Sequence, residues 1–137
     1  MASTLNPYIA FRGNAREAME FYRDALGGDL TITTFAEFGQ ADAPFADQVM
    51  HSMLTTPAGF TLMASDSPPG MEYNPGTNVN LSLFGDDEAE LRGYFEGLSA
   101  GGTITMPLER QVWGDTYGQC VDRFGIGWMV NISAPAR

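Results

Sequence analysis

Two stretches of the chain repeat apolar residues at the i, i+3, i+4, i+7 spacing that predicts an amphipathic helix. They cover residues 15–26 and 88–99, and each follows a polar residue suited to capping a helix, Asn14 and Asp87. A pair of glycines after each stretch predicts the end of the helix. The apolar positions expected to face the core are Ala18, Phe21, Tyr22 and Ala25 in the first stretch and Leu91, Tyr94, Phe95 and Leu98 in the second.

Short runs rich in threonine, valine, isoleucine and aromatic residues flank the two predicted helices, and turn residues separate them. One such run precedes each helix and three follow it. The predicted strands are residues 7–12, 30–38, 48–55 and 60–65 around the first helix and 78–84, 103–106, 116–122 and 126–132 around the second.

The caps, the apolar positions and the final glycines of the two helices recur at a constant offset of 73 residues, from Asn14 and Asp87 to Gly28 and Gly101. We therefore predict a single domain, residues 1–137, that contains one βαβββ unit twice. The units cover about residues 5–66 and 77–133, and a loop rich in proline and glycine, residues 66–77, joins them. A second long loop, residues 107–115, carries Trp113.

Composition narrows the possible chemistry. The chain has one cysteine, Cys120, one histidine, His51, and no lysine. These counts exclude an intrachain disulfide, a site with two imidazoles from one chain, and Schiff-base catalysis by lysine. Cys120 has no neighbouring base in the sequence, so we expect a buried, inert thiol.

The charge balance bears on partners and location. Seven basic residues stand against seventeen acidic ones, giving a net charge of −10, and the arginines are scattered. Without a basic stripe, we expect neither a nucleic acid nor an anionic membrane as a partner; an acidic protein slightly favours a cationic ligand. The chain begins without a signal-peptide pattern and has no apolar run long enough to span a membrane, so we expect a cytoplasmic protein.

The doubled unit and a series of short motifs resemble the vicinal oxygen chelate superfamily, which includes glyoxalase I, ring-cleaving dioxygenases and bleomycin-resistance proteins. Within it, the sequence is most similar to the PhnB-like branch. The resemblance implies an α+β fold in which two tandem βαβββ units form a curved mixed sheet or half barrel around a cavity, and a homodimer. The motifs that carry it are residues 7–11, 17–22, 49–51, 62–66, 101–108, 113–114 and 122–131.

The same resemblance locates the positions that hold a divalent ion in metal-using relatives, where histidine, glutamine or glutamate come from the first and last strands of each unit. In this sequence they are Pro7, Met63, Asn80 and Met129. None is a carboxylate or an imidazole, and an asparagine carbonyl is a weak ligand for a transition metal. We therefore expect no metal and no other cofactor.

Strand alternation predicts which side chains line the cavity. His51 is the only catalytic candidate, as a base or as a ligand anchor, and a structural role for it is the alternative. Trp113 is expected at the cavity mouth, and Trp128 is expected under a helix. The predicted lining consists of Ile9, Phe11, Met63, Asn80, Ser82 and Met129, with His51, Met53, Tyr117 and Gln119 added in one possible register.

Such an apolar, aromatic and methionine-rich lining suits a small organic ligand. The leading hypothesis is therefore binding of a small molecule without a divalent metal, as in the drug-sequestering relatives. The alternative is a metal-dependent lyase, isomerase or dioxygenase of the glyoxalase or extradiol type, in which His51 acts with a carboxylate such as Glu37, Asp115 or Asp122. A third possibility is a regulatory subunit with a vestigial cavity.

Overall fold

The computed structural model describes residues 3–134, which form two compact units divided between Pro75 and Gly76. The division lies in the segment between the last strand of the first βαβββ unit and the first strand of the second. Each unit contains one four-stranded mixed sheet and one α-helix, and neither sheet closes on itself. The α+β prediction of two βαβββ units is confirmed.

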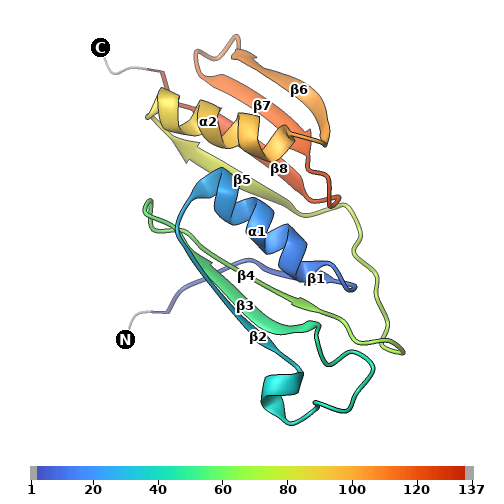
Figure 1. The fold of residues 1–137 in the computed structure, drawn as a ribbon. Helices are drawn as coiled ribbons and strands as arrows, with labels where there is room; N and C mark the ends of the chain where they lie inside the picture. Colours follow the sequence, from blue (N-terminus) through green and yellow to red (C-terminus); the bar gives the residue numbers. More distant parts are fainter. Residues whose placement is uncertain (1–2, 135–137) are drawn as a thin grey trace. The chain divides into compact units, whose positions relative to one another are not determined.

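In the first unit the sheet has the order β1-β4-β3-β2, with β1 parallel to β4 and the other pairs antiparallel. The helix α1 packs on one face of this sheet (Figure 1). Met19 and Tyr22 of α1 are buried, as are Leu54 and Leu62 of the sheet. The elements are β1 (Tyr8–Phe11), α1 (Ala15–Leu26), β2 (Asp29–Thr34), the 3₁₀ helix η1 (Ala36–Phe38), β3 (Val49–Thr55) and β4 (Thr61–Asp66).

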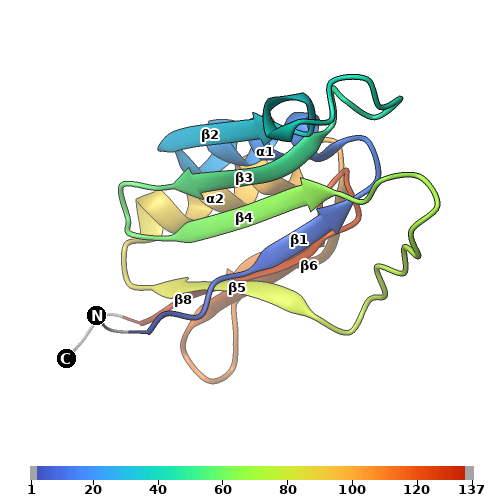
Figure 2. The ribbon, with the colours of Figure 1, turned by 90° about the horizontal axis from the view of Figure 1, so that it is seen from below.

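The second unit repeats this topology with the order β5-β8-β7-β6, and β5 is parallel to β8. The helix α2 packs on one face of this sheet, and Leu91 and Leu98 of α2 are buried with Trp128 and Val130 of β8. Seen from below, β2, β3 and β4 of the first unit lie in front of α1 (Figure 2). The elements are β5 (Asn80–Gly85), α2 (Glu88–Ser99), β6 (Thr103–Arg110), β7 (Thr116–Val121) and β8 (Gly127–Ile132).

Both helices have the predicted bounds, but their N-termini are capped differently. Asp87 caps α2 as predicted, because its side chain accepts a hydrogen bond from the Glu90 N–H. The prediction for Asn14 is wrong, since its side chain makes no capping hydrogen bond. Asp66, at the end of β4, replaces it: its Oδ1 accepts from the N–H groups at both ends of the turn into α1, Gly13 at 2.8 Å and Ala15 at 3.0 Å.

Two strand boundaries differ from the prediction. The strand expected over residues 30–38 ends at Thr34 and is followed by η1. The strand expected over residues 103–106 continues to Arg110, through Pro107. Because β6 is an edge strand with register shifts, a proline without an N–H group is tolerated there.

The constant offset of 73 residues between equivalent positions of the two units does not hold beyond the ends of the helices. A Cβ on Gly28 would lie 2.2 Å from the Thr55 carbonyl oxygen, and one on Gly102 would lie 2.2 Å from that of Val121. Gly28 therefore corresponds to Gly102, not to Gly101. The second unit has one additional residue between its helix and the following strand.

The two α-helices of the described region have 12 residues each, and no helix within residues 3–134 is long and apolar enough to cross a membrane.

Candidate functional site

Each sheet has a face turned away from its own helix, which we call the far face. The strand register shows which side chains share it in the first unit. Tyr8 of β1 pairs with Met63 of β4, and Met63 pairs with Met53 of β3. The residues that alternate with Met53 and Met63, Leu54 and Leu62, are buried in the core. The row Tyr8–Met63–Met53 therefore lies on the far face.

His51 also lies on the far face of the first sheet, two residues before Met53. Its Nδ1 is 3.2 Å from the Tyr8 hydroxyl, and the two ring centroids are 5.8 Å apart. This contact spans β4, which lies between β1 and β3 in the sheet. The structure thus brings together the predicted His51, Met53 and Met63 and adds Tyr8, which the sequence analysis missed.

The prediction that Ile9 and Phe11 line the cavity face is wrong. They were expected on the same face as Met63, but their register partners are Ala64 and Asp66, one residue out of phase with Met63. Phe11 is only 1% exposed and belongs to the core. The alternation in β1 was therefore counted from the wrong residue, and Tyr8 takes the expected place of Ile9.

The far face of the second sheet carries all five strand residues predicted for this unit. Ser82 pairs with Met129, and Met129 pairs with Gln119. Gln119 donates a hydrogen bond from its Nε2 to the Tyr117 hydroxyl at 2.8 Å. Asn80 lies at the end of the same face beside Gly127, where a Cβ would be 2.0 Å from the Asn80 Oδ1.

A second cross-strand row on this face contains residues that the sequence analysis did not assign to the site. Phe84 pairs with Asn131, and Asn131 pairs with Tyr117. Phe84 is 70% exposed, although it is a large apolar residue on a regular strand. Counting by two from Ser82 and Met129 reaches Phe84 and Asn131, so strand alternation was a sufficient signal for both.

Trp113 lies in the turn between β6 and β7. Trp113 is 59% exposed, and its ring centroid is 6.0 Å from that of Tyr117 at an interplanar angle of 62°. Asp115 follows in the same turn, with Oδ2 accepting from Asn131 Nδ2 at 3.1 Å and Oδ1 accepting from the Ala134 N–H at 2.9 Å. These hydrogen bonds, the Ala134 bond first, lower the pKa of Asp115. Its carboxylate is therefore ionised at neutral pH.

Trp128 packs on the side of α2, as expected. It is 3% exposed, and its Nε1 donates to Asp122 Oδ2 at 2.8 Å. Asp122 Oδ1 accepts two further hydrogen bonds, from the N–H groups of Phe124 and Ile126. The carboxylate of Asp122 therefore accepts hydrogen bonds from residues in and next to the β7–β8 turn. This structural role argues against the hypothesis that Asp122 acts with His51.

The positions implied for a metal do not fit a divalent ion. Met63 and Met129 offer thioethers, Asn80 offers an amide, and the Pro7 carbonyl accepts a hydrogen bond from the Met63 N–H. Hard and borderline divalent ions prefer carboxylates and imidazoles. Within residues 3–134, no group of three or more histidine, cysteine, aspartate or glutamate residues is arranged to hold an ion.

Cys120 is buried, as expected. Burial, and then the negative charge of Asp122, raise the pKa of its thiol to about 11. The thiolate form that acts as a nucleophile is therefore scarce at neutral pH.

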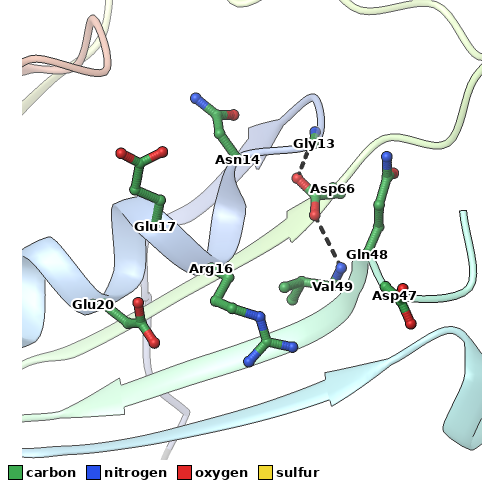
Figure 3. Close-up of a pocket in the computed structure, with 9 residues that line it drawn as sticks. All are labelled: Gly13, Asn14, Arg16, Glu17, Glu20, Asp47, Gln48, Val49 and Asp66. Carbon is green, nitrogen blue, oxygen red and sulfur yellow. Dashed lines mark hydrogen bonds between the residues drawn. The ribbon is translucent and has the colours of Figure 1, made fainter.

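A polar pocket of about 340 Å³ opens at the start of α1 (Figure 3). At its centre Asp66 accepts hydrogen bonds from Gly13 and, through Oδ2, from the Val49 N–H at 2.9 Å. Arg16 and Glu17 point to opposite sides of the helix (Figure 3). The central carboxylate has a capping role, and the charged groups around it do not converge on one point.

Comparisons with known proteins agree with this architecture. A sequence model of the Glyoxalase/Bleomycin resistance protein/Dioxygenase superfamily matches residues 4–130. Protein YjdN of Escherichia coli is 27% identical over 93% of this chain and 94% of its own length. The uncharacterized protein Mb0911c of Mycobacterium bovis is 31% identical over 97% of this chain and 84% of its own length.

Solved structures show the same fold. Protein PA1353 from Pseudomonas aeruginosa is 36% identical and superposes with a TM-score of 0.84, covering 98% of this chain and 100% of the other. A PhnB protein from Bacillus cereus is 22% identical, with a TM-score of 0.77 over 96% of this chain and 100% of the other. The second likeness concerns the fold alone.

Proposed function

Since the chain belongs to the glyoxalase/bleomycin resistance protein/dioxygenase superfamily, we propose that it binds a small organic molecule on the far face of one of its sheets, without a divalent metal. The observation that carries the proposal is the chemistry of these faces. They combine thioethers and aromatic rings with a few amides and hydroxyls, the mixture typical of sites for small organic ligands. Each far face is considered by itself. That of the first sheet carries Tyr8, His51, Met53 and Met63, and that of the second sheet carries Asn80, Ser82, Phe84, Tyr117, Gln119, Met129 and Asn131.

The metal-free part of the proposal is supported by the donor atoms available. The implied ligand positions supply two thioethers, one amide and one proline. His51, the one imidazole, is hydrogen-bonded to Tyr8. Polarisation of substrate oxygens by a Lewis acid therefore has no suitable set of ligands on these faces.

The first experiment is elemental analysis of untagged protein incubated with manganese, iron, nickel, copper and zinc and then dialysed. We expect less than about a tenth of an ion per chain, because thioethers and a single amide are weak ligands for these divalent ions. A stoichiometric ion that resists dialysis would overturn the metal-free proposal and would favour the lyase or dioxygenase alternative.

The second experiment is a thermal-shift screen of small organic molecules, followed by calorimetric titration of the compounds that stabilise the protein. A ligand on the far face of the second sheet should bind more weakly to Met129→Ala, and a ligand on the far face of the first sheet should bind more weakly to Met63→Ala. Each methionine is at the centre of the cross-strand row of its own sheet. Met71→Ala is the matched control, since Met71 is an exposed methionine outside the sheets. Equal affinity for Met63→Ala, Met129→Ala and the Met71→Ala control, or no ligand in a broad screen, would count against the proposal.

A further inference from the structure

We propose that Trp113, Tyr117 and Asp115 form a binding site for an organic cation, of the class of quaternary ammonium and aryl-ammonium compounds. This inference rests on the proposed function and names the chemical class of its ligand. It is carried by an aromatic pair with an exposed indole and by an ionised carboxylate that is hydrogen-bonded to the register partner of Tyr117.

The aromatic pair supplies two ring surfaces at an angle. The planes of Trp113 and Tyr117 meet at 62°, and their centroids are 6.0 Å apart. A cation within about 6 Å of such a ring is attracted by its quadrupole, most strongly by tryptophan. Trp113 remains more than half exposed, so an indole surface is available to a ligand from solvent.

Tyr117 is held in place before any ligand arrives. It lies in the middle of the sheet between its register partners Asn131 and Glu109, and its hydroxyl accepts a hydrogen bond from Gln119. A ligand therefore meets an aromatic side chain that is already positioned, which limits the entropy lost on binding.

The negative charge of Asp115 is linked to Tyr117 through one side chain, that of Asn131. Asp115 Oδ2 accepts a hydrogen bond from the Asn131 side chain, and Asn131 is the register partner of Tyr117. No ion pair involves Asp115 in the part of the chain that the structure describes. Its charge is fixed in position but is not neutralised by an arginine, and a bound cation would supply the missing counter-charge.

A third apolar surface extends the site along the sheet. Phe84 lies on the other side of Asn131 from Tyr117, in the same cross-strand row, and most of its ring is exposed. Large exposed aromatic side chains gathered around a polar group commonly mark binding sites. The rings favour an organic cation over a simple metal ion, which would gain little from contact with them. The negative charge of Asp115 favours a cation over an anion, which it would repel.

The test compares two probes of nearly equal shape, choline and its uncharged analogue 3,3-dimethylbutan-1-ol, with benzyltrimethylammonium as a larger cation. Binding is followed by tryptophan fluorescence, to which exposed Trp113 responds directly while Trp128 is buried, and by calorimetry. We expect both cations to bind at least about tenfold more tightly than the uncharged analogue, and their affinity to fall with added salt.

Two variants locate the site. Trp113→Leu should weaken cation binding by about fivefold to thirtyfold with little effect on folding, because the side chain is exposed. Asp115→Asn should weaken it by a similar factor and remove most of the salt dependence. The matched control is Phe38→Leu, which removes an aromatic ring of nearly equal exposure, 60%, from η1 of the first unit. It should leave the affinity unchanged.

Equal affinity for choline and its uncharged analogue would overturn the cation inference while leaving small-molecule binding intact. Absence of binding by all three probes at millimolar concentration would also overturn it, and the compound screen described above would still test the proposed function separately. Equal losses in Trp113→Leu and Phe38→Leu would show that the site lies elsewhere.

Discussion

Replacing Asp66 by alanine should destabilise the first unit more than any other single capping change. Asp66 is 4% exposed and accepts hydrogen bonds from three backbone N–H groups, those of Gly13, Ala15 and Val49. These bonds join the end of β4 to the start of α1 and to the start of β3. One side chain therefore holds three segments that are distant in the sequence.

The magnitude follows from the number and kind of these bonds. A hydrogen bond to a charged group contributes about 1.5–3 kcal/mol, and an unpaired buried N–H costs about 1–3 kcal/mol. Because the three bonds share one acceptor, their contributions do not simply add. We expect Asp66→Ala to lower the free energy of unfolding by about 3–5 kcal/mol. Asp66→Asn, which keeps one carbonyl oxygen, should lose less.

The matched control is Asp87→Ala. Asp87 caps α2 through a single hydrogen bond, to the exposed N–H of Glu90, and its loss should cost only about 1 kcal/mol. Urea denaturation gives the free energies of unfolding. Hydrogen exchange at Gly13, Ala15 and Val49 shows whether the three amides lose protection. If Asp66→Ala cost no more than Asp87→Ala, or if these amides stayed protected, the long-range capping argument would be refuted.

Three further predictions concern buried groups and close contacts within each unit. Burial, followed by the hydrogen bond to Glu90, raises the pKa of Tyr94 from 10.0 to about 12. The free energy of unfolding should be retained below pH 10 and should fall as the pH rises toward 12, and Tyr94→Phe should flatten this part of the stability profile. Gly28→Ala should lower the free energy of unfolding, measured by urea denaturation, clearly more than Gly59→Ala. Both glycines have positive φ (+109° and +94°), but only a Cβ on Gly28 would clash with the backbone. Iodoacetamide at pH 8 should modify Cys120 slowly in the folded protein and rapidly in urea, and equal rates would contradict its burial and raised pKa.

The helices were predictable because their signals are local. Apolar spacing and glycines close in sequence determined both sets of bounds. The cap of α1 was not predictable in this way, because Asp66 is 51 residues from Ala15 along the chain. Asn14 has the preferred residue type at the cap position, but the buried carboxylate supplies the hydrogen bond instead.

The candidate site was predictable only where the strand register could be counted. In the second unit, alternation placed Ser82 and Met129 on one face, with Gln119 added in one possible register, and the structure agrees. The strand β1 has four residues and pairs in parallel with a strand more than 50 residues later. Its phase depends on that pairing, so Tyr8 was missed and Ile9 was chosen in its place. The hydrogen bonds of Asp115 to Asn131 and Ala134 likewise join segments whose proximity only the fold reveals.

The central claim is that a small organic molecule binds without a divalent metal, and the most direct measurement is calorimetric titration of the best ligand from the screen in the presence and absence of EDTA. We expect the same affinity and stoichiometry in both titrations, because thioethers, aromatic rings and amides form the far faces. Loss of binding in EDTA, restored by adding back a divalent ion, would contradict the account.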